Sequence, residues 1–123
     1  MEADERERVR RQIADALPIP EEIAEAFSGM TADVVMGGVW SRIDALPARD
    51  RSLITIAALT ALDRPHELEI HLGLGLDNGL SRSEICEVLM HMAVYGGWPV
   101  AVEGMRTAKA VFAARDAADA EGA

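Results

Sequence analysis

The sequence lacks several residue types on which recognisable sites are commonly built. Its 123 residues include one cysteine, Cys86, and one lysine, Lys109, and only 4% are aromatic. A single thiol excludes an internal disulfide and a CxxC redox pair. Cys86 falls in an apolar helical pattern, where we expect a buried and unreactive thiol. With so few aromatic residues, the core has to be built from Leu, Ile, Val, Ala and Met.

Positive charge is also scarce, since 21 acidic residues outnumber 12 basic ones and leave a formal charge of −9. Binding to a phosphate backbone needs clustered Lys and Arg. The arginines Arg6, Arg8, Arg10 and Arg11 alternate with acids, which predicts a solvated helix face. We therefore expect no nucleic-acid partner.

Long apolar runs are missing as well. No run approaches the ~20 residues that span a bilayer, and the acidic residues 1–5 lack the apolar core of a signal peptide. We expect a cytoplasmic protein without a membrane partner. Half of the residues are nevertheless hydrophobic, which fits one globular domain. Small Ala-rich helical domains often complete their core by assembling into an oligomer.

Helical punctuation recurs along the chain, without the strand-like alternation and hairpin signals of a sheet. The helix after Pro47 is apolar nearly all round and is expected to be the most buried element. Asn78-Gly79 supplies a left-handed cap, and Ser81 to Glu84 forms a capping box. The sequence thus predicts one all-α domain of about six helices, over residues 3–16, from about 20 to beyond 30, and over 47–62, 65–78, 82–95 and 99–114.

We divide the chain into three parts. Residues 1–19 form a charged N-terminal helix or arm, and residues 20–115 form the helical domain. Residues 116–123 are rich in Ala and Asp and are expected to be a frayed C-terminal tail.

Glu67 and His71 are the most informative pair in the chain. They lie four residues apart in a stretch rich in Leu, Ile and Ala, which places both on one helix face. A Glu and a His on an apolar surface have to be paired, solvated in a cavity or used in chemistry. A structural pair that bridges helices is the alternative. Gly73 and Gly75 follow closely and permit close helix approach or leave room for a ligand.

A zinc-protease motif is excluded by spacing. His66 and His71 are five residues apart, so they point about 140° away from each other on a helix. A metal site formed by Glu67, His71 and His91 is geometrically possible. Nothing in the sequence requires it, and we expect no metal.

A second polar pair, His91 and Tyr95, also lies four residues apart on one helix, where it could line a pocket. The alternative is a core histidine with a boundary tyrosine. Arg51, at the start of the apolar helix, and Arg42, close to Trp40, suit bidentate binding of a substrate carboxylate. Salt bridges within the chain are the alternative role for both arginines.

Six short motifs follow one another in a fixed order over roughly residues 24–113. They are Trp40-Ser41-Arg42, Arg51-Ser52-Leu53-Ile54-Thr55-Ile56-Ala57, Glu67-Leu68-x-x-His71, Asn78-Gly79-Leu80-Ser81, Glu84-Ile85-x-Glu87-Val88-Leu89 and His91-Met92-Ala93-Val94-Tyr95-Gly96-Gly97-Trp98-Pro99. This series resembles the carboxymuconolactone decarboxylase family.

The resemblance implies the all-α fold that this family shares with the alkylhydroperoxidase AhpD proteins. Those proteins use a CxxC pair followed by a histidine. Their cysteine positions fall at Arg64 and Glu67 here, and their upstream glutamate falls near Ser52. Without either thiol, disulfide-based peroxide reduction is excluded.

The resemblance further implies decarboxylation of a small carboxylated lactone similar to 4-carboxymuconolactone. The conjugated lactone accepts the electrons that CO2 leaves behind, so no metal or organic cofactor is needed. His71 would be the general acid or would stabilise the enolate-like charge, and Glu67 would fix its tautomer and raise its pKa. The expected substrate-binding residues are Arg51, Arg42, Trp40, His91 and Tyr95.

Family members typically assemble as trimers or hexamers with pockets near subunit contacts, which implies self-association here. Two alternatives remain open. The chain could be a related lyase, isomerase or cyclase that tailors another small acid, or a catalytically silent oligomeric protein that binds a ligand in the same pocket.

Overall fold

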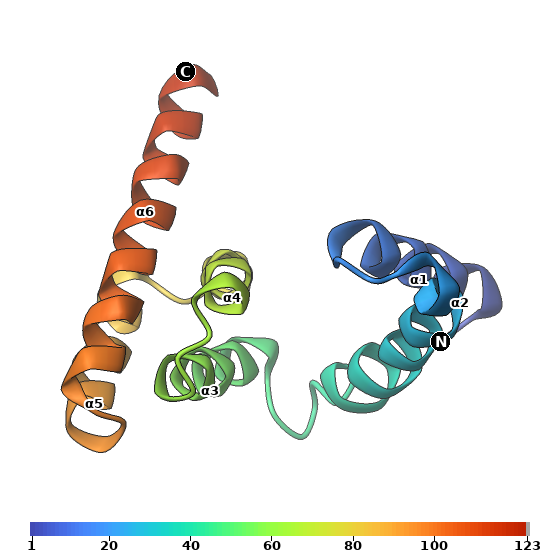
Figure 1. Ribbon diagram of the computed structural model, residues 1–123, viewed down its shortest axis with the longest axis horizontal. Helices are drawn as coiled ribbons and strands as arrows, with labels where there is room; N and C mark the ends of the chain where they lie inside the picture. The colour runs from blue at the N-terminus through green and yellow to red at the C-terminus, as the bar shows by residue number, and fades with distance from the viewer. Residues whose placement is uncertain (123) are drawn as a thin grey trace. The chain divides into compact units, whose positions relative to one another are not determined.

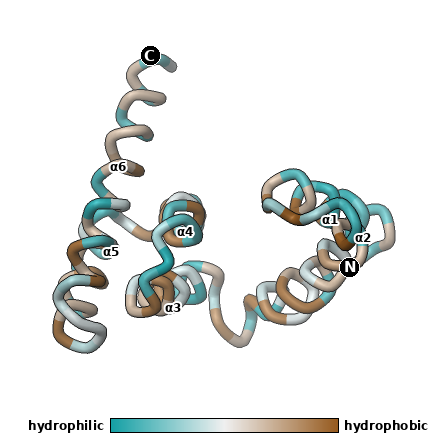
Figure 2. Tube along the Cα trace, in the orientation of Figure 1, coloured by the Kyte–Doolittle hydropathy of each residue, from teal (hydrophilic) through white to brown (hydrophobic). Residues whose placement is uncertain are grey.

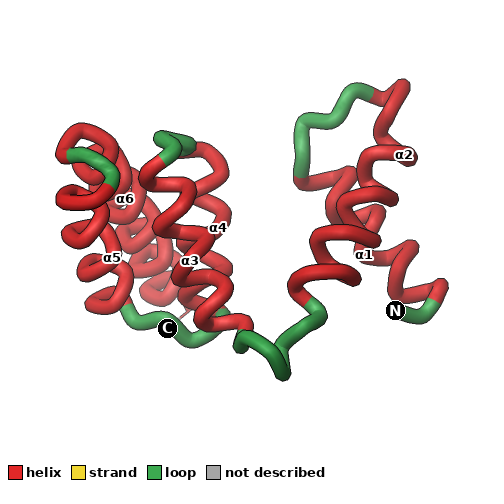
Figure 3. The backbone as a smooth tube through the Cα atoms, turned by 90° about the horizontal axis from the view of Figure 1, so that it is seen from below, coloured by secondary structure: helices red, strands yellow, loops and turns green. Residues whose placement is uncertain are grey.

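The computed structural model describes residues 1–122, and this range is helical apart from its turns and loops (Figures 1 and 3). The all-α prediction is confirmed for this range, which contains six α-helices, one π-helix and no strand. No helix among the described residues is long and apolar enough to cross a membrane. The chain separates into two compact units, Met1–Pro47 and Ala48–Ala123, which we describe one at a time.

The first unit contains α1 (Ala3–Ala16), α2 (Glu21–Met30) and the π-helix η1 (Thr31–Trp40), each packed against the other two. Helix α1 is largely hydrophilic (Figure 2). The prediction that its arginines form a solvated face is only partly correct, because two of them bind residues of the neighbouring helices. Arg6 pairs with Asp33 at 2.6 Å, and Arg10 pairs with Glu7 and donates to the buried Ser28 hydroxyl at 3.0 Å. These bonds tie α1 to α2 and η1.

The second unit contains α3 (Ala48–Ala61), α4 (Pro65–Asp77), α5 (Arg82–Tyr95) and α6 (Trp98–Gly122) (Figure 1). Helices α3 and α6 each pack against both α4 and α5, so α4 and α5 lie diagonally across the bundle. The hydrophobic core between them is aliphatic, as the scarcity of aromatic residues predicts. They are Ile56, Leu68, Leu72, Leu80, Ile85, Leu89, Ala108 and Val111.

The predicted end of α4 and the predicted start of α5 agree with the structure. The capping box at Ser81 and Glu84 opens α5 with both of its hydrogen bonds, and Gly79 takes a φ of +104° after α4. The predicted end of the last helix is wrong, because α6 continues past Ala114 to Gly122. Alanine is the best helix former, and no glycine or proline interrupts residues 105–121. Residue 123 of the predicted tail lies outside the described residues, and the three-part division of the chain stays a prediction.

One burial prediction is wrong, because Cys86 is exposed on α5. Helix α3 is the least exposed helix among the described residues, as predicted, although one side of it reaches solvent at Ile54, which is 54% exposed. Periodicity identifies an apolar helix, but it does not state how many neighbours surround it.

Helices α3 and α4 approach each other closely at Gly75. A Cβ atom there would lie 2.9 Å from Cδ1 of Ile56 and 3.1 Å from Cδ1 of Leu80. Three residues later, the Asn78 side-chain amide donates to the hydroxyl of Ser52, which is 0% exposed, at 2.9 Å. These two contacts fix the position of α4 along α3, and with it the position of His71, one turn before Gly75.

We expect Gly75→Val to lower the free energy of unfolding by about 2 kcal/mol, because the added carbons overfill the α3–α4 contact. Gly73→Val is the matched control on the same helix. A Cβ at Gly73 would meet only the tip of Arg115, at 3.4 Å. Guanidinium titrations followed by circular dichroism give both values, and equal losses would contradict the close approach.

Candidate functional site

Helix α4 places His71 and Glu67 in different environments. His71 is half-buried, and its Nδ1 atom is inaccessible to solvent. Glu67, one turn earlier, is exposed. Within residues 1–122, no hydrogen bond or ion pair joins these two side chains. The spacing therefore places them on neighbouring parts of one helix without making them a bonded pair.

Burial lowers the pKa of His71 below its ordinary value of 6.5, because the imidazolium form loses its hydration when the ring is partly buried. The expectation that Glu67 raises this pKa is wrong. Its carboxylate is in water, where it does not offset the cost of burying the charged ring. His71 is consequently neutral in the free protein at pH 7.

Helix α5 brings His91 and Tyr95 together as the sequence predicts. Their rings stack with centroids 4.7 Å apart and planes inclined by 26°. Tyr95 is 76% exposed, and His91 lines a groove between α3 and α5. This is a stacked pair at the edge of an open surface and not a core histidine.

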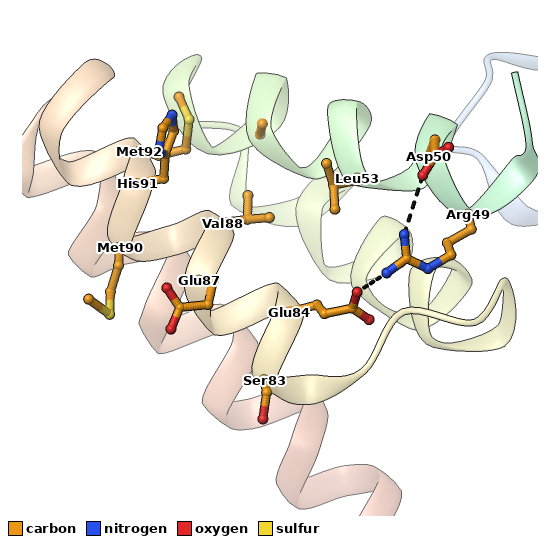
Figure 4. Close-up of a pocket in the computed structure, with 11 residues that line it drawn as sticks. Arg49, Asp50, Leu53, Ser83, Glu84, Glu87, Val88, Met90, His91 and Met92 are labelled. Atoms are coloured by element: carbon orange, nitrogen blue, oxygen red, sulfur yellow. Dashed lines mark hydrogen bonds and ion pairs between the residues drawn. The ribbon is translucent and has the colours of Figure 1, made fainter.

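The α3–α5 groove is a feature that sequence reasoning missed (Figure 4). It has a volume of about 740 Å³, within the range of small-molecule sites. Apolar side chains from both helices meet in it: Leu53, Ala57 and Val88. Charged residues line the groove as well. Glu87 lies one turn before His91 on the same helix, and this spacing was the sequence signal that could have identified the groove. These charged residues are Arg49, Asp50, Glu84 and Glu87.

Arg49 crosses one end of the groove from α3 to α5. It bonds to Asp50 at 3.3 Å on its own helix and forms an ion pair with Glu84 (Figure 4). The one guanidinium in the groove is therefore already matched by carboxylates.

The other predicted site residues belong to several elements. Arg51 lies half-buried in the first turn of α3, next to Ser52 and hence level with Asn78. His71 precedes Asn78 by seven residues, about 10 Å along the helix axis. Trp40 ends η1, and Arg42 follows it, so both belong to the first unit.

The metal alternative requires Glu67 and His71 on α4 to meet His91 on α5, which lies diagonally across the bundle. Among residues 1–122, no three His, Cys, Asp or Glu side chains lie close enough together to hold a metal ion.

Comparison with known proteins identifies a family and several relatives. The model of the carboxymuconolactone decarboxylase family matches residues 25–110, which run from α2 into α6 and include His71 and the α3–α5 groove. A 4-carboxymuconolactone decarboxylase of Acinetobacter baylyi is 40% identical over 86 residues, which are 70% of this chain and 63% of that protein.

Two more distant relatives differ in what their names state. A nitrosuccinic acid decarboxylase of Metarhizium robertsii is 36% identical over 69 residues, 56% of this chain and 48% of that protein. An uncharacterised 15.0 kDa protein from the nqo9–nqo10 intergenic region of Paracoccus denitrificans is 31% identical over 101 residues, 80% of this chain and 68% of that protein. The chain thus spans less than two thirds of each relative named as a decarboxylase.

The burial of neutral His71 predicts a pH-dependent stability. Since its folded pKa is lower than 6.5, the unfolded chain binds more protons in that window. The neutral buried ring therefore contributes its full share to the stability of the fold above pH 6.5, and this contribution is lost as the pH falls. We expect denaturant titrations from pH 7.5 to 5 to show the wild type losing stability relative to His71→Gln. A difference that stays constant over this range would contradict neutral burial.

Proposed function

Because the chain belongs to the carboxymuconolactone decarboxylase family, we propose that it releases CO2 from a small carboxylated lactone or a related acid without a cofactor. The observation that carries this proposal is that both relatives whose names state an activity are decarboxylases, although their named acids differ. The reaction class is common to these relatives, and the substrate is not.

The two named acids share a chemical feature that defines the proposed substrate class. 4-Carboxymuconolactone carries an unsaturated lactone, and nitrosuccinic acid carries a nitro group. Each group can accept the electron pair that remains when the bond between carbon and the leaving carboxylate breaks. The proposed substrate is therefore a small acid whose carboxylate lies next to such an electron acceptor.

His71 is the proposed proton donor. The ring is neutral in the free protein, and a bound anion favours its charged form, so that substrate binding loads a proton onto His71. When CO2 leaves, the electron pair moves into the acceptor group and forms an enolate-like anion. The imidazolium then protonates carbon and returns to the neutral state. Exposed Glu67, one turn away, is proposed to return a proton from water to His71.

The anionic groups of the substrate need positive charge, and Arg51 is the proposed partner in the second unit. Its guanidinium is half-buried at the start of α3, where reduced hydration strengthens pairing with a carboxylate. Arg42, Trp40, His91 and Tyr95 are further proposed contacts with the substrate. We also propose that the chain self-associates as a trimer or hexamer.

His71→Gln tests the proton donor. We expect kcat for CO2 release from 4-carboxymuconolactone to fall by about 10²–10⁴-fold, because the amide cannot supply a proton. His66→Gln is the control, since His66 is exposed at the start of the same helix and should leave turnover unchanged. Helix content by circular dichroism should match the wild type in both variants. Full activity in His71→Gln would exclude this role, and conversion of the lactone without CO2 would indicate an isomerase or cyclase.

The pH dependence of the rate tests whether His71 acts in its protonated form. If the charged ring is the active form, kcat/KM falls as the pH rises through the free pKa of His71, which lies below 6.5. The fall in kcat should occur at higher pH, because the bound anion raises that pKa. Initial rates from pH 5 to 9 give both profiles. Activity that increases with pH over this range would refute a protonated His71.

A further inference from the structure

Two exposed faces of the second unit carry opposite charge. The first is the α3–α5 groove, with carboxylates from Asp50, Glu84 and Glu87 and the single guanidinium of Arg49. Three negative charges and one positive charge leave the groove with two net negative charges. Glu87 is exposed, and no ion pair involves it in the described part of the chain.

The second face, which we call the α6 surface, lies on one side of α6. Its residues recur at the three- and four-residue spacing of a single helix face. It contains two cations and no carboxylate. Its residues are Val102, Met105, Arg106, Lys109, Ala110 and Ala113.

Both cations of the α6 surface are available to a partner. Lys109 is the only lysine of a chain with a net charge of −9, and it is exposed. Arg106 has one ion pair, with Glu103 at 3.4 Å on its own helix, and the side chains are 73% and 47% exposed. Such an exposed pair contributes little free energy and is easily exchanged for another.

The two faces also match in polarity. The groove lies between two helices and contains Leu53, Ala57 and Val88 (Figure 4). The α6 surface is one helix face with Val102 and Met105 at 42% and 38% exposure, followed by small alanines. A single helix fits between two others when its side chains enter the space between them, and small residues permit close approach.

We propose that the α6 surface of one copy of this chain docks in the α3–α5 groove of a second copy. The two faces are different parts of the same unit, so each copy has one groove to offer and one α6 surface to insert. A contact of this kind repeats from copy to copy and closes into a ring when the rotation permits it. The inference rests on the proposed self-association, and it is independent of the proposed decarboxylation.

Docking has a consequence for the proposed pocket. His91 lines the groove, and Tyr95 is stacked on it. An α6 surface from the next copy would cover the groove in which His91 lies and would remove it from bulk water. The surroundings of His91 would then be completed by a second copy.

A charge swap tests the contact by sedimentation velocity at low salt. The wild type should sediment as an oligomer. Lys109→Glu and Glu87→Lys should each weaken association by at least ~10-fold, because like charges then face each other. The double variant Lys109→Glu/Glu87→Lys should restore the wild-type mass, since opposite charges meet again. Arg64→Glu and Glu69→Lys make the same charge changes at exposed positions off both faces and should leave the mass unchanged.

Three results would overturn the proposal. A wild type that stays monomeric at ~100 µM would exclude self-association altogether. A wild-type oligomer that responds to Lys109→Glu no more than to Arg64→Glu would exclude this contact and leave self-association intact. Failure of the double variant to recover the wild-type mass would show that the two residues do not face each other. The measured mass does not depend on whether the chain releases CO2, so the two proposals fail separately.

Discussion

The close approach of α3 and α4 at Gly75 is the constraint on which the second unit depends. The space that a side chain would need there is occupied by Ile56 and Leu80. The bond from Asn78 to the buried Ser52 hydroxyl holds the same contact one turn further along. Because the two contacts lie three residues apart on a rigid helix, α4 can neither slide nor rotate without losing one of them.

Glu67 and His71 show that spacing and environment are separate properties. A four-residue separation places two side chains on one helix face, but the neighbouring helix covers only part of that face. His71 is on the covered part, where burial disfavours its charged form, and Glu67 is on the solvated part. The resulting histidine is neutral and partly shielded, and under the proposed function it becomes a proton donor only when an anion binds.

The few basic residues of this acidic chain occupy particular positions in the packed second unit. Six of the eleven arginines and the single lysine belong to the second unit, and three of these arginines pair with acids on other helices. Arg49 joins α3 to α5, and Arg82 joins the start of α5 to Asp116 on α6 at 2.6 Å. Arg115 reaches from α6 to Asp77 at 3.0 Å. Arg106 and Lys109 lie together on one outward face of α6.

The sequence by itself determined the helical class, most helix boundaries, the capping box at Ser81 and the left-handed glycine at Gly79, because caps and breakers act within a few residues. It also excluded dithiol chemistry, and its motifs gave the family. Only the tertiary structure decided which faces are covered. It exposed Cys86 and Ile54, formed the α3–α5 groove and lowered the pKa of His71. The π-turns of η1 and the helical end of α6 were likewise not predicted. Burial and grooves arise between segments that are distant in the sequence, so local periodicity cannot predict them.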